Sequence, residues 1–192
     1  MLKLILASAS PRRAEILHNA GFPFTVISSA VDETPFPDES PRAYVARVAA
    51  AKAELVAARA LGPAIVLAAD TIVVLDERIL GKPRSELDAR HMLKALGGRT
   101  HAVLTAVTLI RLPDAERQEF IESTLVDFAE LTEEEISRYL ATDEPHDKAG
   151  AYAIQGRAGR YIPRIEGCYF NVVGLPIARV QQALVELGWT ED

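Results

Sequence analysis

Residues that could bind an anion gather in the run from Leu4 to Arg13, LILASASPRR. An apolar segment leads there into two serines, a proline of the kind that begins helices, and two adjacent arginines. Hydroxyl donors and guanidinium forks where a strand gives way to a helix are the components of an anion site. Their charge makes a phosphate the expected anion. The candidate donors are Ser8, Ser10, Arg12 and Arg13.

A single carboxylate, Asp70, interrupts the otherwise apolar and β-branched run 64–75. An ionised carboxylate is rarely buried without a partner, because the loss of its hydration is costly. Two interpretations remain open from the residues alone. Asp70 either caps a turn at the end of a strand, or serves as a metal ligand or general base at the carboxyl edge of a sheet.

Three further charged residues are ambiguous when each is considered alone. Lys52 lies on the flank of a predicted amphipathic helix, where its ammonium either reaches solvent or points into a cleft. Lys82 stands between Gly81 and Pro83 in a loop with little conformational freedom. Glu33 belongs to an acidic, proline-rich loop, and its ordinary interpretation is a solvated charge.

Taken together, these residues fit phosphoryl chemistry. Cations neutralise charge on phosphate oxygens, while carboxylates hold Mg²⁺ or orient a water. Other phosphate and metal motifs are absent from the sequence. It contains neither the Gly-x4-Gly-Lys-Ser/Thr loop of P-loop enzymes nor a Gly-x-Gly-x-x-Gly after a strand. Its four histidines do not have the spacing of zinc ligands.

Composition narrows the class of protein. The 192 residues suit a single domain, 1–192, and the net charge of −6 argues against a general nucleic-acid binder. We expect neither a signal peptide nor a membrane span, since no apolar run approaches roughly 20 residues. The single cysteine, Cys168, fits a reducing cytoplasm, and its aromatic neighbours favour a packed side chain over a nucleophile.

The periodicity predicts an α/β fold with a mixed sheet, because strands and helices do not alternate strictly. The predicted strands cover 3–7, 24–28, 64–75 (one strand or a pair), 100–112 and 118–130. The predicted helices cover 11–19, 41 to the Gly62-Pro63 pair, 85 to the Gly97-Gly98 pair, 132–141 with a capping box, and a last helix from Pro176. Between them, 147–159 is a glycine-rich segment.

Four ordered motifs resemble the Maf family of nucleoside triphosphate pyrophosphatases. They are SASPRR at 8–13, ADT at 69–71, GKP at 81–83 and DKAGAYAIQG at 147–156, and the match runs from residue 3 to about 178. The resemblance implies an elongated, Maf/ITPase-like α/β fold with a long mixed sheet, helices on its faces and two lobes around a central cleft. It also implies that homodimers are common.

Within that family, three positions separate the branches. The branch that acts on dTTP and UTP resembles this chain at Arg12, Thr71 and Gln155, whereas the branch that acts on 7-methyl-GTP carries different residues there. The resemblance therefore implies that these three residues read the base. Ala153 is a small departure, since glycine is common at that position, and its methyl group could narrow the pocket.

The resemblance also implies roles for the other candidates. Asp70 would accept the proton of the attacking water and help hold Mg²⁺ or Mn²⁺ together with Glu33. The triphosphate would be bound by Ser8, Arg13, Lys52 and Lys82. The resulting hypothesis is hydrolysis of dTTP or UTP to the monophosphate and pyrophosphate. Two alternatives are a pyrophosphatase for modified or non-standard nucleotides and a non-catalytic nucleotide-binding regulator of septum formation.

Overall fold

The computed structural model describes residues 2–190. Over this range seven strands form one sheet in the order β2-β1-β3-β5-β6-β7, with β4 paired to β3. β1 pairs in parallel with β2 and β3, whereas β4 and β7 pair antiparallel with β3 and β6. The predicted α/β class with a mixed sheet is therefore confirmed. None of the helices in the described range is long and apolar enough to cross a membrane.

The elements follow one another along the chain, and the longest connection without a helix or strand, residues 27–40, lies between β2 and α2. The strands are β1 Lys3–Leu6, β2 Phe24–Val26, β3 Ala64–Leu75, β4 Arg78–Leu80, β5 Thr100–Leu112, β6 Arg117–Asp127 and β7 Arg164–Glu166. The α-helices are α1 Pro11–Asn19, α2 Pro41–Ala57, α3 Glu86–Leu96, α4 Glu133–Leu140, α5 Tyr169–Val173 and α6 Ile177–Glu186. Three short 3-10 helices, Glu144–Asp147, Ala149–Ala151 and Arg157–Tyr161, lie between α4 and β7.

The chain divides into two compact units, and β3, β5 and β6 contribute residues to both. The first unit consists of the described residues of Met1–Asp70, Thr105–Glu122 and Gly174–Asp192, and the second of Thr71–Leu104 and Ser123–Val173. Two units agree with the two expected lobes. The single-domain organisation and the central cleft stay predictions.

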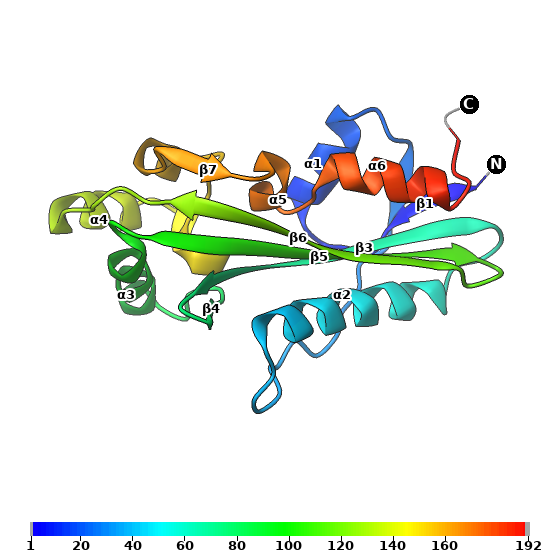
Figure 1. Cartoon of the computed structure of the whole chain (residues 1–192), viewed down its shortest axis with the longest axis horizontal. Coiled ribbons are helices and arrows are strands. Elements are labelled where there is room, and N and C mark those ends of the chain that lie inside the picture. Colours follow the sequence, from blue (N-terminus) through cyan, green and yellow to red (C-terminus); the bar gives the residue numbers. More distant parts are fainter. Residues whose placement is uncertain (1, 191–192) are drawn as a thin grey trace. The chain divides into compact units, whose positions relative to one another are not determined.

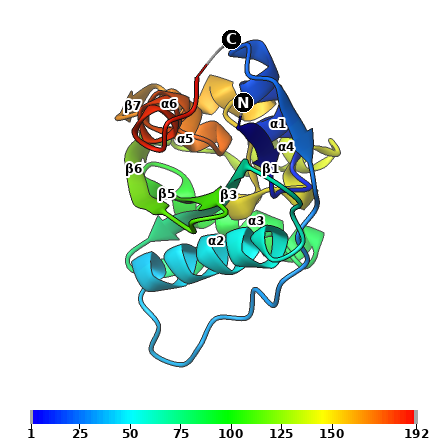
Figure 2. The same cartoon turned by 90° about the vertical axis from the view of Figure 1, so that its right-hand side faces the viewer.

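In the first unit, helices cover both faces of the sheet: α2 lies along one face, and α1 and α6 along the other (Figure 1, Figure 2). One buried cluster joins α2 to the sheet. Its members are Ile5, Ala7, Ala53, Val56, Ala64, Val66, Ala68 and Ile110. Because successive strand residues point to opposite faces, the even-numbered residues of β3 share the face that α2 covers. The same alternation brings Asp70 to that face.

The second unit has its own core, built from its strands and from α3 and α4. Buried members include Val73 and Leu75 of β3, Leu93 and Leu96 of α3, Ile136 and Leu140 of α4, and Phe128 after β6. The predicted capping box begins α4, since Thr132 Oγ1 accepts from the Glu135 N–H while a Glu135 carboxylate oxygen accepts from the Thr132 N–H. This prediction is confirmed.

Several boundaries differ from the sequence prediction. The expected strand 24–28 ends at Val26, and the helix expected to reach Gly62 ends at Ala57. The run 64–75 is one strand rather than a pair. The short elements β4, β7 and α5 and the 3-10 helices were not predicted. They are three to five residues long, too short for hydrophobic periodicity to reveal.

Candidate active site

A charge cluster in the first unit joins Asp70 of β3 to Lys52 of α2 and Glu33 of the loop before α2. Lys52 Nζ lies 2.8 Å from Asp70 Oδ1 and 2.7 Å from Glu33 Oε1. Asp70 and Lys52 are only 7% and 8% exposed, whereas the Glu33 side chain is 53% exposed. Because a buried charge needs a partner, the ion pair between the Lys52 ammonium and the Asp70 carboxylate offsets the hydration that both groups lose. We call these three residues the lysine–carboxylate cluster.

Lys52 resolves one ambiguity of the sequence. Its side chain is buried beneath the helix flank rather than extended into solvent, and its ammonium points to Asp70 on the sheet face that α2 covers. The ammonium therefore points inward, and a cleft at this position stays a prediction.

Asp70 does not end its strand, and this part of both sequence interpretations is wrong. The carboxylate lies inside β3, which continues to Leu75. Its parallel neighbour β1 ends at Leu6, which is paired with Leu67. A strand advances about 3.3 Å per residue, so Asp70 lies roughly 10 Å beyond the carboxyl end of β1. The carboxyl end that was expected at Asp70 is the end of β1. The strand β3 is longer and carries Asp70 past that end.

Ser8 and Arg13 meet at that carboxyl end. The Arg13 guanidinium donates through Nε to the Gly174 carbonyl at 2.9 Å and through Nη1 to Ser8 Oγ at 3.2 Å. The Ser10 N–H donates to the same Ser8 oxygen at 3.1 Å, although the Ser10 side chain does not cap α1. Burial lowers the pKa of Arg13, and the negative charge of Asp70 counteracts that effect. We call Ser8 and Arg13 the Ser8–Arg13 cradle, and the charge of Asp70 acts on its guanidinium.

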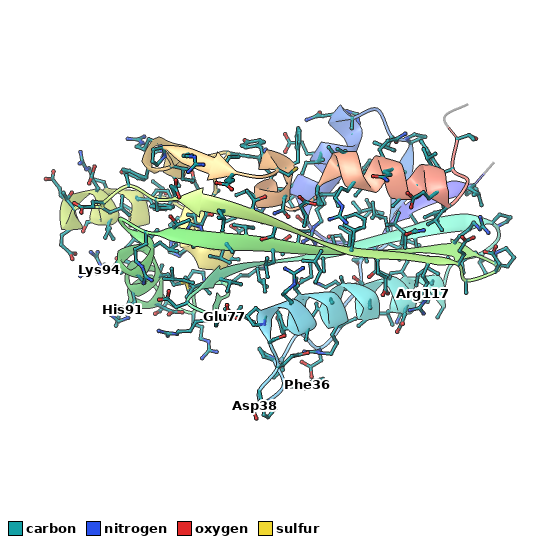
Figure 3. All side chains as sticks on the ribbon, in the orientation of Figure 1. Phe36, Asp38, Glu77, His91, Lys94 and Arg117 are labelled. Carbon is teal, nitrogen blue, oxygen red and sulfur yellow. The ribbon has the colours of Figure 1, made fainter. Side chains whose placement is uncertain are left out.

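The loop that carries Glu33 is tied to the first turns of α2. Tyr44 donates its hydroxyl to the Glu33 carbonyl at 2.9 Å. Arg47 makes two bonds to the Glu39 carboxylate, at 2.6 and 2.7 Å, and stacks 4.0 Å from the Phe36 ring centroid. Phe36 and Asp38 lie at the outer end of this loop (Figure 3). Two α2 residues thus fix the backbone that presents the Glu33 carboxylate.

Sequence reasoning missed the anchoring roles of Tyr44 and Arg47. Tyr44 is buried on α2, and its hydroxyl also holds the loop. A spacing of three residues places both side chains on one side of the helix. That spacing, next to an acidic loop, is the signal that could have found them.

The remaining predicted residues have separate environments. Arg12 is half-buried on α1, next to the buried Arg13. Thr71, half-buried, begins the part of β3 that belongs to the second unit, which also holds the exposed Lys82 and Gln155. Across residues 2–190, no hydrogen bond or ion pair engages the side chains of Lys82 or Gln155. The roles of Arg12, Thr71, Lys82 and Gln155 stay predictions.

The carboxylates of Glu33 and Asp70 suit a hard divalent cation. Mg²⁺ is commonly held by one or two carboxylates plus substrate phosphates, rather than by an all-protein cage. Both carboxylates converge on one ammonium, so their oxygens lie near each other. In the described part of the chain, no group of three or more His, Cys, Asp or Glu residues could hold a metal by itself. The donor set therefore fits a cation that is shared with a phosphate ligand.

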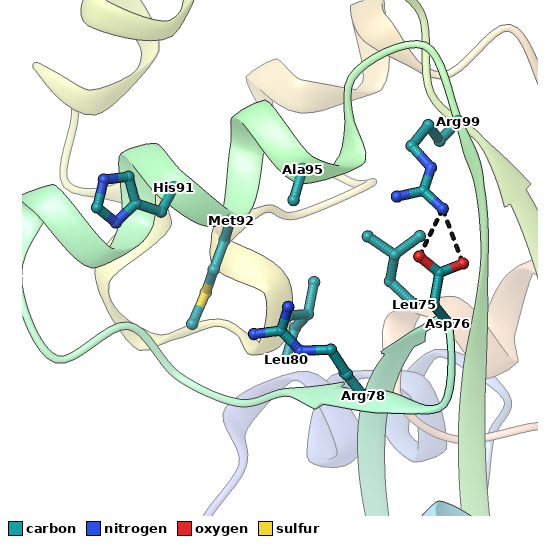
Figure 4. Close-up of a pocket in the computed structure, with 8 residues that line it drawn as sticks. All are labelled: Leu75, Asp76, Arg78, Leu80, His91, Met92, Ala95 and Arg99. Atoms are coloured by element: carbon teal, nitrogen blue, oxygen red, sulfur yellow. Dashed lines mark hydrogen bonds and ion pairs between the residues drawn. The ribbon is translucent and has the colours of Figure 1, made fainter.

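A pocket in the second unit is separate from all predicted site residues. It encloses about 220 Å³ between the β3–β4 turn and α3 (Figure 4). Its apolar floor includes Leu75, Leu80 and Met92, and the Arg99 guanidinium pairs with the Asp76 carboxylate at its edge. Arg78 also lines this pocket, and neither Ser8 nor Arg13 is among its lining residues.

Solved structures of Ham1 proteins share this fold. A Ham1 protein from Coxiella burnetii covers 97% of this chain and all of its own length, with a TM-score of 0.53 and 13% identity. The Staphylococcus aureus Ham1 protein matches with a TM-score of 0.50 and 16% identity over similar shares. At these identities the similarity concerns the fold alone. The expected Maf/ITPase-like architecture is confirmed.

Sequence relatives are far closer. The dTTP/UTP pyrophosphatase of Syntrophus aciditrophicus is 49% identical over 97% of this chain and 90% of its own length. The enzymes of that name from Moorella thermoacetica and Symbiobacterium thermophilum are 49% and 50% identical, each over 98% of this chain and 96% of their own length. The family described as Maf-like protein matches residues 3–187. This chain therefore belongs to the Maf family.

Proposed function

We propose that this protein hydrolyses dTTP and UTP to the nucleoside monophosphate and pyrophosphate. The observation that carries the proposal is the buried Asp70 carboxylate, held by Lys52 and electrostatically coupled to the Ser8–Arg13 cradle. An acceptor for a proton and a binder for phosphate thus occur in one unit. The names of close relatives support the choice of dTTP and UTP as substrates.

In this mechanism Asp70 takes a proton from water, and the water oxygen attacks the α-phosphorus. The bond between the α-phosphorus and the oxygen that bridges it to the β-phosphorus breaks, and pyrophosphate leaves with that oxygen. Arg13 and Lys52 neutralise charge that develops on the leaving group, and Lys82 is proposed to contribute in the same way. Ser8 orients the Arg13 guanidinium and offers a hydroxyl to a phosphate oxygen.

A divalent cation, Mg²⁺ or Mn²⁺, is proposed to be held by Glu33 and Asp70. When bound it would neutralise phosphate charge and help align the phosphates. Lys52 Nζ contacts both carboxylates and holds their oxygens near each other. The chain's own contribution is thus a pair of preorganised carboxylates.

Base selection is proposed to depend on Arg12, Thr71 and Gln155. The glutamine amide carries both a donor and an acceptor, which match O4 and N3–H of uracil or thymine. Gln155 is exposed and its amide is not engaged by another described residue, so the amide is available to a ligand. We further propose that the enzyme acts in the cytoplasm as a homodimer, without nucleic-acid or membrane partners.

Asp70→Asn tests the assignment of the base. The amide keeps the size of the side chain but accepts a proton poorly, so pyrophosphate release from dTTP should fall by about 10²-fold or more. Asp76→Asn is the matched control, because Asp76 is an exposed aspartate at the end of the same strand, paired with Arg99 outside the site. Near wild-type turnover in Asp70→Asn, measured as pyrophosphate released per minute, would show that another group activates the water.

A further inference from the structure

Gln155 lies in a tight turn of the second unit. The Gly156 N–H donates to the Ala153 carbonyl at 3.1 Å, so Gln155 is the third residue of a four-residue turn. Gln155 is exposed, whereas Tyr152 before the turn is buried and Ala153 and Ile154, the first two residues of the turn, are half-buried. The turn backbone therefore sets the position from which the Gln155 side chain extends.

Two side chains hold this turn from both of its ends. The Glu144 carboxylate accepts from the N–H groups of Arg157 and Ala158, at 2.8 and 3.3 Å, and from the Tyr139 hydroxyl at 2.7 Å. The Tyr139 oxygen in turn accepts from the Ala153 N–H at 3.3 Å. We call Glu144 and Tyr139 the turn anchor.

The turn anchor fits its surroundings closely. A Cβ at Gly156 would overlap the Glu144 carboxylate, so the absence of a side chain there lets the turn approach the anchor. Burial, together with the Glu144 carboxylate, raises the pKa of Tyr139, which keeps its hydroxyl able to donate. Just before the turn, the buried Tyr152 hydroxyl lies 2.8 Å from His101 Nε2.

A fixed turn matters because a glutamine amide is ambiguous. In one orientation its NH₂ and C=O match O4 and N3–H of uracil, and after a half-turn they match N3 and the amino group of cytosine. An amide on a loose backbone can satisfy either base. The half-turn occurs within the side chain itself, so discrimination also depends on the place at which the turn holds the amide relative to the other groups that contact the base.

We propose that Glu144 and Tyr139 are positioning residues for base selection, acting through the turn that presents Gln155. The inference rests on the proposed function, since it presumes that Gln155 reads the base. Neither anchor residue needs to touch the nucleotide. Their effect is on the ratio of kcat/KM for UTP to kcat/KM for CTP.

The test measures that ratio in Glu144→Gln, which keeps the size of the side chain but replaces one acceptor oxygen with an amide NH₂. A donor then faces a donor on one side of the turn, and a hydrogen bond that held the turn is lost. The ratio should fall about tenfold, as expected for a small displacement of a binding group. Tyr139→Phe, which removes the acceptor for the Ala153 N–H, should lower the ratio in the same direction. Both nucleotides are measured on one enzyme sample, so partial unfolding cancels from the ratio.

Glu134→Gln is the matched control, because Glu134 is an exposed glutamate of α4, and its ratio should equal that of the wild type. Gln155→Ala, which removes the amide, shows how far the ratio falls when the base is no longer recognised by Gln155. If Gln155→Ala lowers the ratio while Glu144→Gln and Tyr139→Phe do not, the anchor has no positioning role. If Gln155→Ala leaves the ratio unchanged, the inference fails although pyrophosphate is released. A wild-type enzyme that releases no pyrophosphate would instead overturn the proposed function itself.

Discussion

At the scale of single residues, the lysine–carboxylate cluster shows what side-chain chemistry can and cannot predict. Asp70 could be singled out because a carboxylate in an apolar run needs a partner. That partner could not be identified, because Lys52 is separated from Asp70 by 18 positions and by the connection between a helix and a strand. Helical periodicity placed Lys52 on a flank, which left its direction open until the sheet face beneath α2 was known.

His101 is another buried titratable residue, and its burial predicts how stability depends on pH. Its side chain is 2% exposed, its Nδ1 lacks a hydrogen-bond partner among the described residues, and burial lowers its pKa from the usual 6.5 to about 4. The unfolded chain therefore binds a proton that the folded chain does not. Stability should fall as pH drops from 6.5 to about 4, by about 3 kcal/mol in total.

Urea unfolding at several pH values checks this expectation. In His101→Gln the loss of unfolding free energy between pH 7 and pH 4.5 should be smaller than in the wild type. His91→Gln, which removes an exposed imidazole of α3, is the control and should follow the wild-type curve. Parallel curves for wild type and His101→Gln would show that the buried imidazole does not resist protonation.

At the scale of elements, local signals predicted where three helices begin, although several other boundaries differ. The helix 11–19 begins with proline, the helix 86–96 is capped by Ser85, and Thr132 and Glu135 form the capping box that their spacing predicted. The elements that were missed owe their form to contacts distant in sequence. β7, for example, has only three residues and exists because it pairs with β6. The turn anchor is of the same kind, since Glu144 binds backbone N–H groups 13 and 14 residues away.

The capping box gives a prediction for α4. Thr132→Ala removes the oxygen that accepts from the Glu135 N–H, and loss of such a cap costs about 1 kcal/mol. Because Ile136 and Leu140 of this helix are buried in the core of the second unit, the cost should register in the unfolding free energy. Ser137→Ala, at an exposed position in the same helix, should cost less, because alanine is the better helix former. Equal losses in the two variants would assign no stabilising role to the cap.

At the scale of the whole molecule, the fold class was predictable and the positions of the site residues were not. Patterning alone gave α/β with a mixed sheet, and the ordered motifs gave the family. The division of β3, β5 and β6 between two units could not be read from periodicity, because each strand is continuous in sequence. As a consequence, the predicted site residues are divided between the two units. The first unit contains the lysine–carboxylate cluster and the Ser8–Arg13 cradle, while the second contains Lys82, Thr71 and Gln155.

The most direct test of the proposed function is a panel of nucleoside triphosphates incubated with the wild-type protein and Mg²⁺ or Mn²⁺. Pyrophosphate and orthophosphate are quantified separately, and 7-methyl-GTP, CTP and the purine nucleotides are compared with dTTP and UTP. The account predicts one pyrophosphate for each monophosphate formed, with the highest kcat/KM for dTTP and UTP. Preference for a purine or a modified nucleotide, release of orthophosphate, or saturable binding without turnover at any metal concentration would contradict it.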